Sequence, residues 1–319
     1  MKDIDLDDPR DVAGGSGERK AAGDAGAATV TAAGSGQGSR GPQGAGQQGA
    51  GQQGAAYGAQ SGTLVSLVAG LATGRIRVVD LTQTLSPDFP QIVLPPEMGQ
   101  CWPFRIEEVS HYDERGGGWY WNNFSCGEHT GTHFDAPIHW ISGRNLPNNA
   151  VDTIPVEHFV GPACVIDCSK EAAADADFLL TADFLKAWEA RHGRIPERSW
   201  VLMRTDWSKR GHDAVAYQNF DETGQHTPGP DAAAVRFLVD ERNIVGFGTE
   251  TIGTDAGQGY HLRPPYPAHY YLHGAGRYGL QCLANLDRLP PTGAVLICAP
   301  LKIEKGSGSP LRVLALVSE

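Results

Sequence analysis

Apolar and polar positions along residues 63–319 follow the two periods that distinguish strands from helices. Strand-like alternation or short apolar runs occur at 76–81, 104–111, 119–125, 163–167, 200–205 and 244–249. Helical spacing occurs at 63–72, 181–192 and 230–242. The last apolar segments, 294–303 and 310–317, predict two closing strands joined by the sequence GSGS. This order of elements predicts an α/β domain with a partly parallel sheet.

Cap residues indicate where two of these helices begin. Thr181 is a side chain of the type that caps a helix, and Gly193 is expected to end the same helix. Pro230 is expected in the first turn of the helix at 230–242, a position that tolerates proline.

Three consecutive glycines, Gly116–Gly118, predict the turn of a hairpin between 104–111 and 119–125. The second strand of that hairpin leads directly into the segment 128–140. A proline-rich loop that ends near Met98 could reach the same place. The hairpin and this loop are therefore expected to border any site in that segment.

Residues 1–62 differ in composition from the rest of the chain. Residues 13–62 contain 16 of the 41 glycines, and Ala, Gln and Ser fill most of the remainder. Such a segment cannot bury enough apolar surface to offset the entropy cost of ordering it. We therefore expect a disordered tail over 1–62 and one domain over 63–319.

Composition also limits the possible partners. The net charge of −11 disfavours nucleic acid, because phosphate binding needs clustered Lys and Arg. No run of about 18 apolar residues occurs, so no membrane partner is expected. The six cysteines form no CxxC pair and several lie in apolar runs, which predicts free thiols in a reducing cytoplasm. A small molecule is the expected partner.

The segment Glu128–Trp140, EHTGTHFDAPIHW, concentrates the chemically active side chains. Within eleven residues it holds His129, His133, Asp135 and His139. Glycine and proline between them disfavour a regular helix, so an extended or looped backbone is expected. In such a backbone His133 and Asp135 lie on the same face. Imidazole nitrogen and carboxylate oxygen bind Zn, Mn or Fe, so this spacing predicts a metal site.

The letters HTGTHFDAPIH, residues 129–139, resemble the HxGTHxDxPxH signature of the cyclase family of metal-dependent hydrolases. That family includes bacterial kynurenine formamidases and isatin hydrolases. The resemblance extends from about Val78 to the C-terminus. It implies the swivelling β/β/α fold, as a single α/β domain with a mixed sheet, and a homo-oligomer, either a homodimer or a homotetramer.

The signature supplies most of the expected metal site. His129, His133 and Asp135 are expected ligands of a divalent ion. His139 is either a further ligand or the general base, and the role of base is favoured. Cys126 lies three residues before His129 and is either a catalytic thiol or a packing residue. Packing is the favoured interpretation of this cysteine.

A second group of candidates lies in the sequence PAHYYLHGAGRYGLQCLANL. His269 matches a family histidine that precedes a glutamate by twelve residues, and Gln281 stands where kynurenine formamidases carry that glutamate. His269 and Gln281 are expected to complete the metal site, whereas His273 is interpreted as a packing histidine. With Asp135 as the only carboxylate, two divalent ions would leave a net charge near +3. We therefore expect one ion per chain, Mn²⁺ or Zn²⁺.

Aromatic residues around the signature could line a pocket for a flat aromatic substrate. These residues are Trp119, Trp121, Phe124 and Phe134. Each of them, taken alone, is also explained by packing in the core.

Weaker candidates are charged residues that follow predicted strands or flank the signature. Arg204 and Asp206 could orient a carboxylate product, or form a structural ion pair. Glu250 or Asp255 could reach the metal. Glu128 could orient His129, or be an exposed side chain.

These expectations describe a cytoplasmic, metal-dependent amidohydrolase that opens a C–N bond in a small cyclic amide or an aryl formamide. Hydroxide activated by the metal would attack the carbonyl while His139 manages the proton. One rival is a lactone hydrolase or cyclase of the same family. The other is a metal-bearing binding protein without activity, which Gln281 alone favours.

Overall fold

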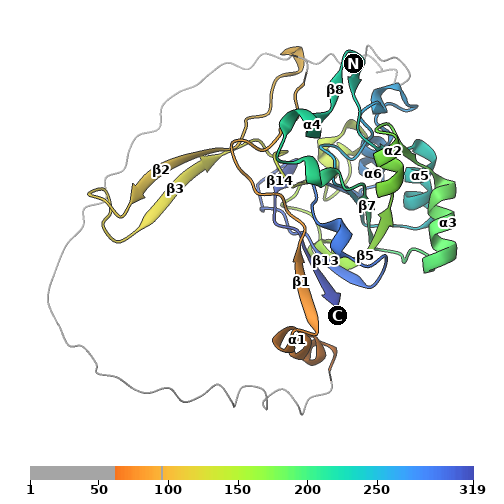
Figure 1. The fold of residues 1–319 in the computed structure, drawn as a ribbon, viewed down its shortest axis with the longest axis horizontal. Helices are drawn as coiled ribbons and strands as arrows, with labels where there is room; N and C mark the ends of the chain where they lie inside the picture. The colour runs from red at the N-terminus through yellow and green to blue at the C-terminus, as the bar shows by residue number, and fades with distance from the viewer. Residues whose placement is uncertain (1–61, 95) are drawn as a thin grey trace. The chain divides into compact units, whose positions relative to one another are not determined.

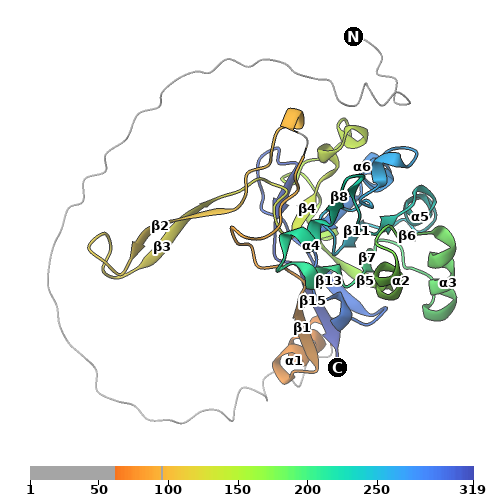
Figure 2. The same cartoon turned by 45° about the horizontal axis from the view of Figure 1, so that its top comes forward.

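A computed structural model describes residues 62–94 and 96–319. The tail predicted over 1–62 lies outside the described residues, except for Gly62. Residues 70–319 form the compact unit that carries the signature, and its main element is a nine-stranded mixed sheet (Figures 1 and 2). The strands follow the order β1-β15-β13-β5-β7-β11-β12-β4-β14. Their bounds are β1 Ile76–Asp80, β4 His133–Asp135, β5 Val160–Asp167, β7 Trp200–Arg204, β11 Gly246–Thr249, β12 Tyr278–Gln281, β13 Ala294–Ile297, β14 Gly308–Pro310 and β15 Leu314–Ser318.

The centre of the sheet is parallel and its two ends are antiparallel. Strands β5, β7, β11 and β12 run parallel to one another, as the alternation of strands and helices predicts. Strand β4 pairs antiparallel with both β12 and β14. The signature thus forms part of the sheet, between two partner strands.

Of the six α-helices in the described part of the chain, α3, α5 and α6 pack on one face of this sheet. The bounds of the six helices are α1 Thr63–Thr73, α2 Ser169–Ala174, α3 Ala182–His192, α4 Ala214–Gln218, α5 Ala232–Arg236 and α6 Pro267–Gly274. The prediction that Thr181 caps the helix that follows it is confirmed, because its side chain accepts a hydrogen bond of 3.2 Å from the backbone N–H of Phe184. Among the described residues, no helix is long and apolar enough to cross a membrane.

Two buried layers cover the two faces of the sheet, and strand β7 shows the division. Val201 and Met203 pack with the helices, in a cluster that includes Trp188 of α3. Trp200 and Leu202 point to the opposite side, into a cluster with residues from β1, β4, β12, β13 and β15. A single cluster that collects side chains from strands along the whole sheet requires a strongly curled sheet. The fold is the mixed α/β fold of the swivelling β/β/α type, as expected.

Three pairs of short strands lie outside the main sheet. The hairpin β2–β3 joins Arg105–His111 to Tyr120–Ser125 and extends away from the sheet (Figures 1 and 2). The predicted hairpin and its glycine-rich turn are confirmed. The other two pairs are β6 Leu179–Leu180 with β10 Gly229–Pro230, and β8 Phe220–Asp221 with β9 Gly224–Gln225.

Several predicted boundaries are wrong, including that of the closing strand predicted over 310–317, which begins at Leu314. Pro230 belongs to strand β10, and helix α5 begins at Ala232 behind Asp231, whose side chain caps it. The closing strand predicted over 294–303 ends at Ile297. The GSGS segment is more than a connection, because its end forms β14 and pairs with the signature strand.

Candidate metal centre

Strand β4 separates the chemistry of the signature from the core. Because side chains alternate along a strand, His133 and Asp135 share one face while Phe134 points to the other. Phe134 is fully buried in the core, next to Trp200 and Tyr278. The structure therefore places Phe134 in the core and not at the wall of a pocket, as the pleat of the strand requires.

Neighbouring strands and a helix surround Asp135. Strand β12 places Gln281 opposite His133, and Asp135 is paired with a glycine on each side, Gly279 and Gly308. A Cβ atom at Gly308 would lie 2.5 Å from Cε1 of His129, so only glycine fits there. The residues around the carboxylate are held by backbone pairing and close packing, and Asp135 itself has 0% exposure.

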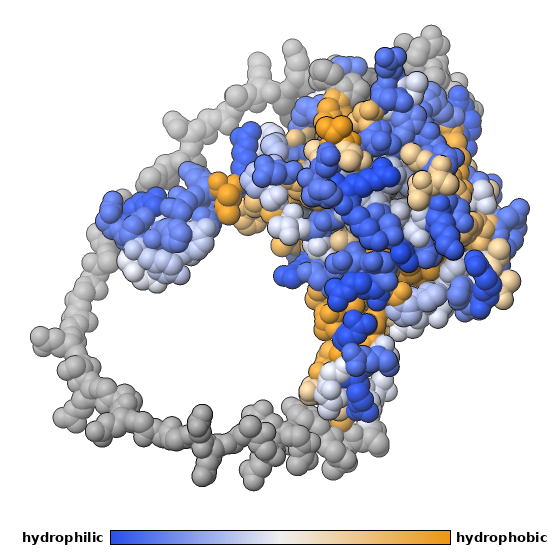
Figure 3. Space-filling view, in the orientation of Figure 1, coloured by the Kyte–Doolittle hydropathy of each residue, from blue (hydrophilic) through white to orange (hydrophobic). Residues whose placement is uncertain are grey.

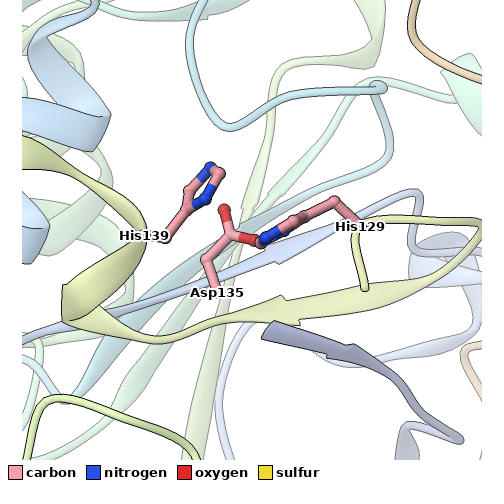
Figure 4. A group of neighbouring side chains, drawn as sticks. All are labelled: His129, Asp135 and His139. Atoms are coloured by element: carbon pink, nitrogen blue, oxygen red, sulfur yellow. The ribbon is translucent and has the colours of Figure 1, made fainter. Parts of the chain in front are cut away.

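The two oxygens of Asp135 face two different groups of side chains. Figure 4 shows Asp135 with His129 and His139. Its Oδ1 lies 2.7 Å from Nδ1 of His129 and 3.6 Å from Nε2 of His133. Its Oδ2 lies 3.7 Å from Nε2 of His269 and 4.0 Å from Nε2 of His273. The same Oδ2 accepts a hydrogen bond from the amide of Gln281.

Hydrogen bonds on the outer side of each ring fix which nitrogen carries the proton. Nδ1 of His133 lies 2.8 Å from the carbonyl of Gly131, and Nδ1 of His273 lies 3.1 Å from that of Arg277. A carbonyl only accepts, so each Nδ1 must donate and each Nε2 directs a lone pair inward. Nδ1 of His269 contacts the carboxylate of Asp255 at 2.5 Å, with the same consequence.

A divalent cation fits this donor set. Several nitrogen lone pairs point at a buried carboxylate, an arrangement that repels unless a positive charge lies between them. Nε2 of His273 and Oε1 of Gln281 are buried and have no hydrogen-bond partner. Two groups of potential ligands result, His129–Asp135–His139 and Asp135–His269–His273, and they share Asp135.

The protonation of these groups suits ligands. Burial lowers the pKa of both His133 and His273 to about 4, so both rings are neutral near pH 7. Burial would raise the pKa of Asp135, but His139 and His129 outweigh it and hold the pKa well below its usual range. Burial would lower the pKa of His269, but its bond to Asp255 raises it. The neutral imidazoles of His133 and His273 and the ionised carboxylate of Asp135 are the forms that bind metals.

His139 lies next to His129, on a short 3-10 turn, Pro137–His139. Its ring centroid is 3.9 Å from that of His129 and 5.7 Å from that of His269. Burial lowers its pKa well below 6.5, so the ring is neutral. Within residues 62–94 and 96–319, no hydrogen bond engages this ring. The position is compatible with both roles expected for His139, ligand and base.

Sequence reasoning missed His273 as a residue of the site. His269 and His273 are four residues apart on helix α6, so both rings lie on the same helix face. That spacing is the signal that could have indicated both. Asp255 fixes the start of the same helix, where its carboxylate accepts from the backbone N–H of Ala268 at 2.6 Å and of His269 at 3.0 Å.

The weaker candidates occupy other places. Arg204 pairs with Asp206 at 2.8 Å, at the end of β7. Glu250 is buried and accepts from the backbone N–H of Thr205 at 2.6 Å and from Oγ of Ser208 at 2.6 Å. Burial raises the pKa of Glu250. These contacts tie a turn to the sheet and do not include the histidines.

Three of the four aromatic candidates lie on the hairpin. Trp119, Trp121 and Phe124 are 53%, 56% and 63% exposed. Phe124 also lines a cavity of 410 Å³ at the base of the hairpin, together with Cys126, Glu128 and Leu311. Apolar side chains gather at this base on the surface (Figure 3). Within one chain, these aromatic residues do not close over Asp135.

Comparison with known proteins gives consistent matches. The Cyclase family model, described as "Putative cyclase", matches residues 79–256. Isatin hydrolase from Roseibium aggregatum is 53% identical over 260 residues, which covers 81% of this chain and 98% of the relative. The match thus covers nearly the whole length of that relative.

Two solved structures are also similar. Isatin hydrolase A from Labrenzia aggregata, bound to benzyl benzoate, has a TM-score of 0.79 and 67% identity, and the match covers 81% of this chain and 100% of that one. An isatin hydrolase bound to the product analogue thioisatinate has a TM-score of 0.79 and 52% identity, with 80% and 98% covered. The described fold and the signature therefore occur together in solved relatives.

Proposed function

This chain belongs to the cyclase family of metal-dependent hydrolases and is an amidohydrolase, and we propose that its substrate is isatin or a close relative. The reaction is hydrolysis of the lactam C–N bond, which yields an amine and a carboxylate. The observation that carries the proposal is the set of imidazole lone pairs around Asp135, described above for His133, His269 and His273. Relatives with this fold are isatin hydrolases, one of them bound to a product analogue.

Four residues would hold the ion. His129 and His133 lie beside Oδ1 of Asp135, and the unpartnered Oε1 of Gln281 adds a neutral oxygen. The nitrogen and oxygen donors suit Mn²⁺ or Zn²⁺. Because Gln281 brings no charge, we propose one ion per chain, with His269 and His273 at its border.

The residues around the ion would perform the remaining steps. When bound, a divalent cation would polarise the scissile carbonyl and lower the pKa of adjacent water. His139 is neutral and takes a proton from the attacking water as the oxygen adds to the carbonyl carbon. The C–N bond then breaks, and His139 returns the proton to the leaving nitrogen.

The hairpin supports a homo-oligomer, either a dimer or a tetramer. An isolated two-stranded hairpin is marginally stable in water, and aromatic residues on it are more than half exposed. We propose that the hairpin packs on a second copy, where Trp119 and Trp121 would contribute to the wall of the substrate pocket. The six free cysteines support a location in the reducing cytoplasm.

Turnover of a small substrate panel tests the function. The panel contains isatin, N-formylkynurenine, a simple aryl formamide and an aromatic lactone, each measured with the metal-loaded protein. Isatin is expected to give the largest kcat/KM. A preference for the formamide or the lactone would assign a different reaction within the family. A protein that binds one equivalent of metal and turns over none of these substrates would be a binding protein.

A further inference from the structure

A hydrogen-bonded series of three side chains leads outward from the metal centre, on the side of His129. Nε2 of His129 lies 2.9 Å from Oγ of Ser307. Oγ of Ser307 donates to the carboxylate of Glu128 at 2.5 Å, and the backbone N–H of Ser307 donates to the same oxygen at 3.1 Å. Glu128 is the neighbour of His129 in sequence, whereas Ser307 comes from the GSGS segment almost 180 residues later.

The donors and acceptors in this hydrogen-bonded series determine which ring nitrogen of His129 carries a proton. A hydroxyl group has one hydrogen, and a carboxylate can only accept. The hydrogen of Ser307 is therefore used on Glu128, and Oγ of Ser307 can only accept from His129. Nε2 of His129 must carry a proton, and in the neutral ring, the form that binds a metal, Nδ1 is then the nitrogen with the lone pair.

That lone pair faces Asp135. Nδ1 of His129 and Oδ1 of Asp135 are 2.7 Å apart. With the proton on Nε2, both atoms are acceptors, and two acceptors at this distance need a cation beside them. The outer contacts of His129 thus prepare its Nδ1 for the same ion that Asp135 would bind.

The backbone around Ser307 packs closely enough against its neighbours to allow the contact with His129. A Cβ atom at Gly306 would lie 2.8 Å from Cγ2 of Val151, and one at Gly308 would collide with the ring of His129. The carbonyl of Ser307 accepts from the backbone N–H of Ala136 at 2.9 Å. Glycine on both sides therefore lets the segment pack closely. The hydrogen bond to Ala136 holds Ser307 at its position beside the ring of His129.

We propose that Ser307, oriented by Glu128, is a positioning residue that keeps the proton of His129 on Nε2, so that His129 binds the metal through Nδ1. This inference rests on the metal site of the proposed function. The alternative is that Glu128 and Ser307 only fasten the loop at 306–308 to the signature.

Metal affinity without substrate separates the two cases. Mn²⁺ alone is titrated into the metal-free protein by calorimetry. Ser307→Ala is expected to weaken binding by roughly 10- to 100-fold, the usual cost of losing a group that orients a metal-binding histidine. Ser309→Ala is the matched control, because Ser309 is a fully buried serine of the same segment whose hydroxyl accepts from the backbone N–H of Leu301. It is expected to leave the Mn²⁺ affinity within about twofold of the wild type.

Variants of Glu128 sharpen the test. Glu128→Gln keeps an oxygen that can accept from Ser307, so most of the affinity should remain. Glu128→Leu removes that acceptor and frees the hydroxyl of Ser307 to donate to His129, so affinity should fall as in Ser307→Ala. Equal Mn²⁺ affinity in Ser307→Ala and wild type would overturn the proposal, as would equal losses in Ser307→Ala and Ser309→Ala.

The position of the proton can also be observed directly. In ¹⁵N spectra of the metal-free protein, with signals assigned by their absence in His129→Gln, His129 should show a proton on Nε2. Ser307→Ala should reduce that population, whereas a wild type with the proton on Nδ1 would contradict the proposal. Neither measurement uses isatin, so a wild type that fails to hydrolyse isatin would count against the proposed function alone.

Discussion

Strand β4 and the hairpin β2–β3 are neighbours in sequence but have opposite surroundings. Strand β4 has three residues, lies between two partner strands, and leaves His133 and Asp135 only 5% and 0% exposed. The hairpin is much longer, yet Trp121 and Phe124 on it are 56% and 63% exposed. The contacts that define β4 lie within one chain, whereas the aromatic face of the hairpin is uncovered there. The proposed metal ligands therefore meet within a single chain, whereas the proposed pocket wall would depend on a second copy.

The largest effect is expected from a substitution of Asp135, the carboxylate at the centre of the buried site. Asp135→Asn removes the carboxylate that both groups of potential ligands share. We expect loss of metal and a fall in turnover on the order of 10³-fold or more, above the 10- to 100-fold typical of residues behind the ligands. Metal content and kcat/KM are measured together. Asp183→Asn, at a side chain that is 93% exposed, is the control and should behave as wild type.

His139 tests whether the buried region contains a base as well as ligands. His139→Ala is expected to keep the metal and lower turnover by roughly 10²-fold, the scale for loss of a general base. Elemental analysis and steady-state kinetics report the two quantities. If metal is lost to the same extent as in His133→Ala, then His139 is a ligand.

Substitutions in the hairpin should change self-association and leave the metal content unchanged. Replacing Trp121 and Phe124 together by serine should leave metal content unchanged and weaken self-association, by roughly 10- to 100-fold for each buried aromatic anchor removed. Sedimentation equilibrium measures the association, and Glu107→Gln on the same hairpin is the control. Unchanged association would show that the hairpin does not cover a second copy.

The buried histidines predict a smaller effect, on the pH dependence of stability. Burial lowers the pKa of His133 and His273 to about 4, below the ordinary value of 6.5. Between these values the unfolded chain binds protons that the folded chain does not, so stability is lost as the pH falls from 6.5 to 4. Each group contributes on the order of 1 kcal/mol per pH unit.

Denaturant unfolding of the metal-free protein measures this slope. His273→Gln should make the slope shallower between pH 6.5 and 4, because one titrating group is removed. His261→Gln, at an exposed position, should leave it unchanged. An equal slope in His273→Gln and wild type would mean that His273 does not resist protonation in the folded state.

The smallest effect is expected from the tail. Removal of residues 1–60 should leave kcat/KM and the oligomeric state unchanged, because the segment lacks the apolar side chains to pack on a core. A large fall in turnover per folded protein, at an unchanged oligomeric state, would assign the tail a part in the site.

Apolar periodicity predicted strands at the places of β1, β5, β7, β11, β13 and β15, the hairpin, and the helix behind Thr181, because burial and capping act locally. It could not predict β14, since Gly308–Pro310 becomes a strand only through pairing with β4. Nor could it separate Pro230 from α5, because Pro230 joins β10 by pairing with Leu180 of β6. Those outcomes depend on partners distant in sequence.

The candidate site shows the same division. The spacing of His133 and Asp135 predicted a shared face, and the same alternation implies that Phe134 points to the core. The contribution of His273 depends on where α6 lies against the sheet, which no local pattern reports. Ser307 stood in a segment with the composition of a linker, and only the folded chain brings it to His129.

We propose that one divalent ion at Asp135 enables this chain to hydrolyse isatin. The most direct measurement is isatin turnover by protein that is stripped with a chelator and then titrated with Mn²⁺ or Zn²⁺. Turnover is expected to be absent in the stripped protein, to rise in proportion to added metal, and to level off at about one equivalent per chain. Full turnover without metal, or a rise that continues to two equivalents, would contradict this account.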